Sequence, residues 1–411
     1  MLIGTPGRIA DILKMDPELG GISMPELDTL ILDEADRLLD DGFWPEIQNI
    51  MSFLPRRRER DRQTLLFSAT APAEVMPVVR NTLKRDYKFV KTVRDDEVPT
   101  HMKVPQKVVW MNGLENAMPT VLEIAKTYMH DDSQSLPFKA IVYFNTGAEV
   151  KLAREFFDNL RFSEDQPIQG VQTYGLYSGL TQGRRNFNSD GFRAARSAIL
   201  LSSSVTARGM DFPNVTHVIQ VGMPATRPEY IHRMGRTGRA DKSGQSWLLV
   251  LGGFNHITRN FRERLGDLPI ETANIEVAKV DMTDGDEVQR ASPASVELIN
   301  QVKKAMKSVS YMTRAEAFRT VQRISGRDLG ITRDAQRKIQ NLLVYGYGIS
   351  NADGVSDSPS RSPFQSRIPR FQTRPSRSRP PGPRFERRSP LFGSNRQSRS
   401  SRERFPWDEG W

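Results

Sequence analysis

Short apolar runs alternate with helical stretches over most of the first 254 residues, and this alternation leaves few folds open. Runs typical of buried strands lie at 107–111, 139–144, 171–177, 198–201, 216–221 and 246–251, with helical patterns at 117–128, 148–160 and 181–187. Strands that alternate with helices form parallel sheets. We therefore expect residues 106–254 to form one complete, doubly wound α/β lobe.

The same alternation occurs upstream, where it supplies only part of a sheet. Strands are expected at 29–32 and 64–67, with helices at 8–13, 45–53 and 73–83. Residues 94–105 are polar, contain two prolines and follow neither a helical nor a strand period. We expect residues 1–93 to form an incomplete first lobe, joined to the second by a linker at 94–105.

Composition excludes several classes of protein. The absence of cysteine excludes disulfides, thiolate metal sites and thiol nucleophiles. No apolar run is long enough to cross a bilayer, so no membrane partner is expected. The first residues resemble neither a secretory signal nor a transit peptide. The +10 charge comes mainly from residues 361–411, which contain 13 arginines and four acids.

A tetrad of residues, Asp33-Glu34-Ala35-Asp36, follows the apolar run at 29–32. Carboxylates at the end of a buried parallel strand are placed to hold Mg²⁺ and to orient a water in a nucleotide hydrolase. Such a site also needs a glycine-rich loop with a Gly-Lys ending that receives phosphates. No Gly-Lys dipeptide occurs in these 411 residues, so the tetrad represents half of such a site.

Five segments in order resemble the DEAD-box ATP-dependent RNA helicases. They are Thr5-Pro6-Gly7-Arg8, Asp33-Glu34-Ala35-Asp36, Ser68-Ala69-Thr70, Ala207-Arg208-Gly209-Met210-Asp211 and His232-Arg233-Met234-Gly235-Arg236-Thr237-Gly238-Arg239. Each segment alone is weak evidence, but their order and spacing together are specific. The resemblance implies two RecA-like lobes, with ATP and Mg²⁺ as cofactors and RNA as partner.

The resemblance also implies roles for individual residues. Asp33 would hold Mg²⁺ through water, and Glu34 would orient and help deprotonate the attacking water. Asp36 would contact the hydroxyls of Ser68 and Thr70, and His232 would couple its own segment to Asp36. Arg236 and Arg239 would stabilise charge on the transferring phosphate. Asp211 would accept hydrogen bonds from the ATP ribose.

RNA contacts are implied on both lobes, mainly to phosphates and therefore without reading the base sequence. The matching residues are Thr5, Gly7, Arg8, Tyr143, Thr146, Gln182, Arg185, Ser203 and Gly209. The chain departs from the family pattern where Ser204 stands in place of an acid, which weakens the expected coupling between lobes. Tyr143 in place of the usual Phe is a milder change.

Larger departures are absences. The family's adenine-reading, phosphate-binding, Pro-Thr-Arg-Glu-Leu and Gly-Gly segments do not occur here. We expect the chain alone to hydrolyse ATP poorly or not at all, and the first sheet to leave an unpaired edge and exposed apolar surface. An incomplete gene model and a genuine short product both explain this pattern.

Beyond residue 254 the strand pattern stops. Apolar positions at helical spacing in 294–346 predict a small helical module, with Thr332 as a cap. We expect residues 255–350 to form a helical C-terminal extension. From Arg264 to about Ser350 the chain resembles the extension of mitochondrial DEAD-box helicases of fungi and plants, on the Leu265-Gly266-Asp267-Leu268-Pro269-Ile270 junction and Ala315-Glu316-Ala317-Phe318. A plain helical cap on the lobe is an equal alternative. Mitochondrial localisation follows from this resemblance only.

Residues 351–411 are rich in Arg, Ser and Pro, and we expect them to be disordered. Arginines interleaved with aromatic residues suit a nonspecific RNA tether, with an inert basic linker as the alternative. Two functions remain open. The first is an ATP-dependent RNA helicase that couples ATP hydrolysis to local duplex unwinding. The second is an ATP-independent RNA-binding protein that uses the second lobe, the extension and the tail.

Overall fold

The structure is a computed structural model with two α/β lobes and a helical extension. It describes residues 1–40, 42–55, 61–68, 72–91, 100–161, 166–203, 210–238, 244–328 and 332–350. The expected fold class, two α/β lobes with parallel sheets and a following helical module, is confirmed. The tail at 351–411 lies outside the described residues.

The first lobe is built on two parallel strands, β1 (Thr29–Leu32) and β2 (Gln63–Leu66), whose last residues are paired. The expected helices are present as α1 (Pro6–Lys14), α3 (Trp44–Phe53) and α4 (Pro72–Thr82). Two further elements, η1 (Pro17–Leu19) and α2 (Ala35–Asp40), were not predicted. Because β1 and β2 are parallel and in register, Asp33 and Phe67 leave the sheet at the same edge.

Apolar surface is exposed on this small sheet. Ile31 of β1 is 55% exposed, and Phe67, directly after β2, is 54% exposed. A two-stranded parallel sheet has few neighbours that can cover such side chains. The exposure matches the expectation of an incompletely covered first sheet.

The second lobe contains a seven-stranded sheet in the order β5-β6-β4-β7-β8-β3-β9. Its strands are β3 (Gln106–Met111), β4 (Lys139–Tyr143), β5 (Gln172–Leu176), β6 (Ala198–Ser202), β7 (His217–Val221), β8 (Gln245–Leu251) and β9 (Ile270–Thr272). All pairings are parallel. Six strands were predicted, and β9 extends the sheet by one short edge strand beside β3.

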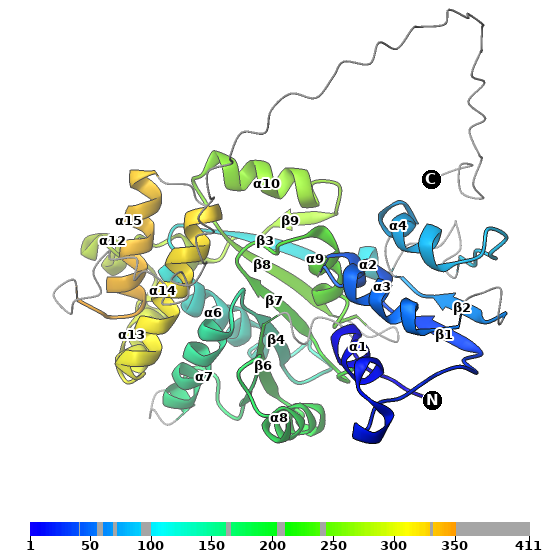
Figure 1. The fold of residues 1–411 in the computed structure, drawn as a ribbon. Helices are drawn as coiled ribbons and strands as arrows, with labels where there is room; N and C mark the ends of the chain where they lie inside the picture. The colour runs from blue at the N-terminus through cyan, green and yellow to red at the C-terminus, as the bar shows by residue number, and fades with distance from the viewer. Residues whose placement is uncertain are drawn as a thin grey trace, which may run out of the picture. The chain divides into compact units, whose positions relative to one another are not determined.

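Helices of this lobe connect its strands (Figure 1). They are η2 (Leu114–Asn116), α6 (Ala117–Met129), α7 (Gly147–Arg161), α8 (Gln182–Ala194), α9 (Arg227–Met234) and α10 (Asn255–Leu265). Strand β4 is buried along its whole length, as a central strand covered on both faces must be. The carboxyl ends of the strands meet at one edge, where sites of such sheets form.

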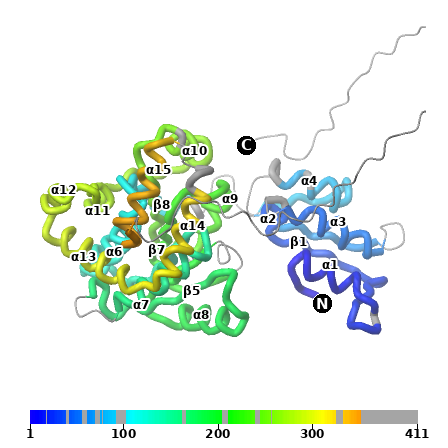
Figure 2. The backbone as a smooth tube through the Cα atoms, turned by 60° about the vertical axis from the view of Figure 1, so that its left-hand side comes forward, coloured from blue at the N-terminus to red at the C-terminus, as the bar shows by residue number. Residues whose placement is uncertain are grey.

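The helical extension packs on α6 and α7 (Figures 1 and 2). It comprises α11 (Glu276–Lys279), α12 (Gly285–Arg290), α13 (Pro293–Lys307), α14 (Tyr311–Asp328), α15 (Arg333–Asn341) and the π-helical turn η4 (Leu342–Gly346). Thr332 caps α15 as predicted, because its hydroxyl accepts a hydrogen bond from Ala335 N at 3.1 Å. Leu298, Ile299 and Val302 of α13 are buried against the lobe.

The predicted linker at 94–105 is only partly described. A short helix, α5 (Thr100–Lys103), occupies its C-terminal part, where no helical period was expected. Its first six residues lie outside the described part of the chain. Within the described ranges, no helix has the length and apolar character needed to cross a membrane.

Candidate functional site

The acidic tetrad begins at the edge where β1 and β2 end. Phe67 N donates to Leu32 O at 2.9 Å, and Ala35 N donates to Phe67 O at 2.9 Å, so β2 holds the turn that follows β1. Glu34 N donates to Asp33 Oδ1 at 2.9 Å. The Asp33 carboxylate is exposed, as a group that meets a ligand must be.

Glu34 has an unusual backbone conformation. Its φ of 50° lies in the left-handed region, which a non-glycine residue adopts at a cost of about 1 kcal/mol or more. The turn is held by the bonds of Ala35 and by Arg37 N, which donates to Glu34 O at 2.9 Å. Strained residues of this kind cluster at functional sites.

Asp36 and His232 form the central contact of the site. His232 Nε2 lies 2.8 Å from Asp36 Oδ2, and the two side chains are 7% and 2% exposed. The pair joins the tetrad at the start of α2 to the arginine-rich segment at the end of α9. These are two residues that sequence resemblance paired, and they are 196 positions apart.

Helix α9 presents His232 because its start is fixed by side chains. Thr226 accepts a hydrogen bond from Glu229 N at 3.2 Å, and Glu229 Oε2 accepts one from Ala225 N at 2.9 Å. Such reciprocal capping satisfies amides that the first turn leaves open. Tyr230 is fully buried and anchors the helix through its hydroxyl, which donates to Gln106 Oε1 at 3.0 Å.

Arg236 is held by two main-chain oxygens. Its Nε donates to His232 O at 3.2 Å and its Nη1 donates to Met210 O at 2.6 Å. Because Met210 precedes Asp211, this bond holds the guanidinium of the expected phosphate-facing arginine beside the segment that carries the expected ribose-binding carboxylate. Asp211 is exposed. Arg239 and Thr70 lie outside the described residues, whereas Ser68 is exposed directly beyond β2.

Arg233 is a buried residue that the sequence reasoning did not single out. Its guanidinium is 2% exposed, donates to Glu229 Oε1 at 2.6 Å and lies 5.3 Å from the centre of the Tyr143 ring. A cation over an aromatic face is attracted by the ring quadrupole. The Thr226-x-x-Glu229 capping pattern in the sequence could have predicted the helix that carries it.

The expected RNA-facing residues of the second lobe divide into two groups. Gln182 and Arg185, on α8, line a hollow of about 390 Å³ that also includes Met210. Arg185 Nη2 donates to Ser178 O at 2.8 Å, which fixes the guanidinium at this hollow.

The residues of the second group that the structure describes are buried or are hydrogen-bonded within the protein. Tyr143 is buried completely, main chain included, so the structure does not present this residue to RNA. Thr146 caps α7, with its hydroxyl 2.9 Å from Glu149 Oε2 and 3.1 Å from Glu149 N. Ser203 is 7% exposed at the end of β6, and Gly209 lies outside the described residues.

In the first lobe, the expected RNA-facing residues lie at the start of α1. Thr5 is the N-cap residue, and its hydroxyl makes no capping bond. Thr5 and Arg8 are exposed and Gly7 is half-buried. The unused amides of a first helical turn are suited to anions such as phosphate. No group of three or more acidic or histidine side chains able to hold a metal occurs within the described ranges.

Burial shifts the pKa of two groups in the second lobe, Glu149 and His217. Burial raises the pKa of Glu149 to about 7, opposed by the Thr146 hydrogen bonds and by the charge of Arg233. Burial lowers the pKa of His217, on β7, to about 3. Glu149 follows a strand end near the candidate site, whereas His217 lies at the opposite end of its strand.

Comparisons with known proteins agree with this geometry. A family model described as DEAD/DEAH box helicase matches residues 1–78, and one described as helicase conserved C-terminal domain matches residues 121–241. The chain is 45% identical over 374 residues to "ATP-dependent RNA helicase mss116, mitochondrial" of Aspergillus fumigatus, covering 90% of this chain and 56% of that protein. It is 45% identical over 289 residues to "ATP-dependent RNA helicase cyt-19, mitochondrial" of Neurospora crassa, covering 69% and 45%.

A solved structure of Mss116p, bound to single-stranded RNA and AMP-PNP, has the same fold with a TM-score of 0.56. It is 24% identical and covers 84% of this chain and 69% of that one. The chain spans about half the length of the two curated relatives. Two matching family models and two relatives of 45% identity agree with the ordered motifs, and the chain therefore belongs to the DEAD-box helicase family.

Proposed function

We propose that this chain carries part of the hydrolytic edge and the complete second lobe of an ATP-dependent RNA helicase that acts in the mitochondrion. The observation that carries the proposal is the hydrogen bond between Asp36 and His232. It links the carboxylate segment to the arginine segment, and hydrolysis in this family is proposed to depend on both. Relatives named as mitochondrial ATP-dependent RNA helicases support the activity and the compartment.

The residues present fit ATP with Mg²⁺. Asp33 offers an exposed carboxylate, and Mg²⁺ is commonly held by one or two carboxylates together with phosphates and waters. When bound, Mg²⁺ would neutralise phosphate charge. Glu34 would accept a proton from the attacking water, and Arg236 would present its guanidinium to the phosphate. Asp211 would accept hydrogen bonds from the ribose.

The RNA strand would lie across residues of both lobes that contact phosphates. Thr5 and Arg8 lie at the start of α1, and Gln182 and Arg185 line the hollow on α8. Most of these groups recognise charge and backbone geometry, so binding would tolerate different base sequences. Affinity should fall steeply as salt rises, because counterions are released from the neutralised phosphates.

The decisive test compares this chain with a version extended by any coding sequence that continues in frame upstream of Met1. We expect RNA-stimulated ATP hydrolysis from the extended protein and little or none from the 411 residues alone, because they contain no Gly-Lys phosphate loop. Glu34→Gln in the extended protein should abolish turnover while RNA binding persists. Turnover that survives this substitution would overturn the proposed role of the tetrad.

The alternative is ATP-independent RNA binding by the second lobe, the helical extension and the basic tail. It is favoured by the complete seven-stranded sheet and the extension packed on it. Binding of a fluorescent single-stranded RNA, with and without AMP-PNP, separates the two functions. If the extended protein binds RNA equally with and without AMP-PNP and hydrolyses no ATP, the alternative is correct.

A further inference from the structure

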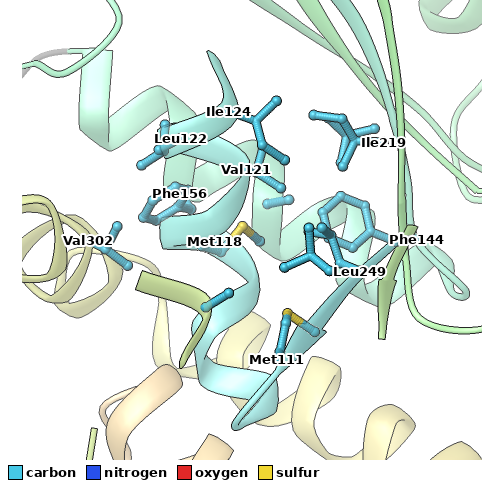
Figure 3. Packing of buried hydrophobic residues seen from close by; sticks show 14 of the residues in the cluster. Met111, Met118, Val121, Leu122, Ile124, Phe144, Phe156, Ile219, Leu249 and Val302 are labelled. Carbon is cyan, nitrogen blue, oxygen red and sulfur yellow. The ribbon is translucent and has the colours of Figure 1, made fainter. Parts of the chain in front are cut away.

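A cavity of about 120 Å³ lies between the second lobe and the helical extension. Its walls are mostly apolar. The lobe contributes Met111, Met118, Phe144 and Leu152, and the extension contributes Val302 and Met306. Figure 3 shows Met111, Met118 and Phe144 from the lobe, with Val302 reaching toward them from α13. The cavity is comparable with an engineered apolar cavity of about 150 Å³ that binds benzene.

A carboxyl group in the cavity wall has an unused acceptor. Glu115, on η2, is 5% exposed, and its Oε2 has no hydrogen-bond partner among the described residues. An unsatisfied buried acceptor is costly, and a partner that enters the cavity would remove that cost. Burial raises the pKa of this carboxyl, which is consistent with its apolar surroundings.

A glycine allows the turn η4 to pack closely against Glu115. Gly346 ends the π-helical turn η4, and a Cβ on it would lie 3.1 Å from Glu115 Cβ and 2.8 Å from Leu342 Cδ1. A larger residue would therefore push η4 away from Glu115. Single π-helical turns occur frequently at functional sites.

Two charged side chains on the wall already have partners. Arg264 Nη1 donates to Pro224 O at 2.9 Å, and Glu149 Oε2 accepts the Thr146 hydroxyl at 2.9 Å. Among the described residues that line the cavity, Glu115 Oε2 is the buried side-chain acceptor without a hydrogen-bond partner. An apolar group about the size of one aromatic ring would fill the remaining space of the cavity.

We propose that this cavity is a binding site for a small apolar molecule that carries one hydrogen-bond donor, which reaches Glu115 Oε2. Lobe and extension both line the cavity, so a bound molecule would stabilise the docking of the extension. None of the residues that line the cavity is assigned to the nucleotide or to RNA, although Glu149 in the wall accepts the hydroxyl of Thr146. The proposal does not rest on the proposed helicase function.

Phenol and benzene are matched probes, because they differ by the donor alone. Methyl NMR of methionine-labelled protein gives the readout. Four methionines line the cavity, Met111, Met118, Met223 and Met306, whereas the exposed Met312 on α14 does not. We expect phenol to shift the four lining methyl resonances and leave Met312 unchanged, with an affinity about tenfold above that of benzene. Absence of shifts at millimolar phenol would overturn the proposal.

Two substitutions locate the binding. Glu115→Met removes the acceptor and keeps the volume, so phenol should bind about tenfold more weakly while benzene binding persists. Equal phenol affinity in wild type and Glu115→Met would refute the role of the carboxyl. Val302→Phe fills the cavity and should abolish binding of both probes, whereas Glu297→Phe, exposed on the same helix, should not. Leu152→Phe repeats this test from α7 if Val302→Phe does not fold, and binding retained in a folded filled variant contradicts the site.

Discussion

His232 Nε2 lies 2.8 Å from Asp36 Oδ2, and both side chains are almost completely buried. A buried carboxylate that loses its partner retains its desolvation cost, so such pairs are strongly coupled. The contact connects Asp36, which lies just beyond Asp33 and Glu34, with α9, the helix that precedes Arg236. It is therefore suited to make the positions of Glu34 and Arg236 depend on one another.

A double-mutant cycle tests this coupling. Asp36→Ala and His232→Ala should each reduce the free energy of unfolding, and the double variant should lose about 1 to 3 kcal/mol less than the sum. Denaturant unfolding of the four proteins gives the value. Arg227→Ala combined with Asp36→Ala is the control, because Arg227 pairs with Asp267 at the surface and should give additive effects. Additive effects in the Asp36 and His232 pair would contradict the coupling.

The raised pKa of Glu149 predicts that the stability of the folded protein depends on pH. Its pKa of about 7 in the folded protein is above the ordinary value of 4.5, so the folded state holds the proton more tightly. The resulting stabilisation is fully present below pH 4.5 and is lost as pH rises through 7. This stabilisation should amount to about 1 to 3 kcal/mol, a value that is lowered for solvent screening because the Glu149 side chain is half-buried.

The matched variant is Glu149→Gln. Glutamine keeps the side-chain oxygen that pairs with Thr146 in the cap, but it does not titrate. Between pH 5 and pH 8 the stability of Glu149→Gln should therefore decline less than that of the wild type. If denaturation curves show the same pH slope for both proteins, another group is responsible.

The main strands could be predicted from the sequence because burial on both faces produces uninterrupted apolar runs. Strand β4, for example, is buried throughout and was predicted with one extra residue. Strand β9 was missed because three residues, only one of them apolar, give no periodic signal. Helix α8 was predicted too short, because its glycines and polar residues hide a face that buries only Ser189 and Phe192.

The candidate site was predicted through motifs, and the helix that carries it was not. Four of eight residues in α9 are buried, but two of them are His232 and Arg233, so hydrophobic periodicity fails there. Their burial is offset by Glu229, one helical turn before Arg233, and by Asp36 and the Tyr143 ring, which are distant in sequence. Such tertiary compensation leaves no local pattern, and only family resemblance paired Asp36 with His232.

His217 should remain neutral and carry its proton on Nδ1. Its Nδ1 lies 3.0 Å from Thr216 Oγ1, which donates its own hydrogen to Lys139 O at 3.0 Å. Thr216 Oγ1 can therefore only accept from His217. Because the pKa is about 3 in the folded protein and 6.5 ordinarily, stability is retained above pH 6.5 and falls as pH decreases toward 3.

Nitrogen-15 NMR of the imidazole can check the tautomer. At pH 5 the spectrum should show one protonated nitrogen, Nδ1, and an unprotonated Nε2. Thr216→Val removes the acceptor and should allow the other tautomer to appear. A doubly protonated His217 at pH 5 in the folded protein would show that the burial of this ring is less complete than the structure indicates.

Arg236 should not be replaceable by lysine. Its Nε and Nη1 reach His232 O and Met210 O together, and this two-pronged attachment fixes the plane of the guanidinium. A lysine has one nitrogen and cannot hold both carbonyls while facing the nucleotide.

In the upstream-extended protein, Arg236→Lys and Arg236→Ala should both lower kcat for RNA-stimulated ATP hydrolysis by about a thousandfold. Arg227→Lys, at the start of the helix that precedes Arg236, should leave kcat within about twofold of the wild type because an exposed ion pair contributes little. Recovery of wild-type kcat in Arg236→Lys would show that a positive charge alone is sufficient, and that the paired attachment to His232 and Met210 has no role in hydrolysis.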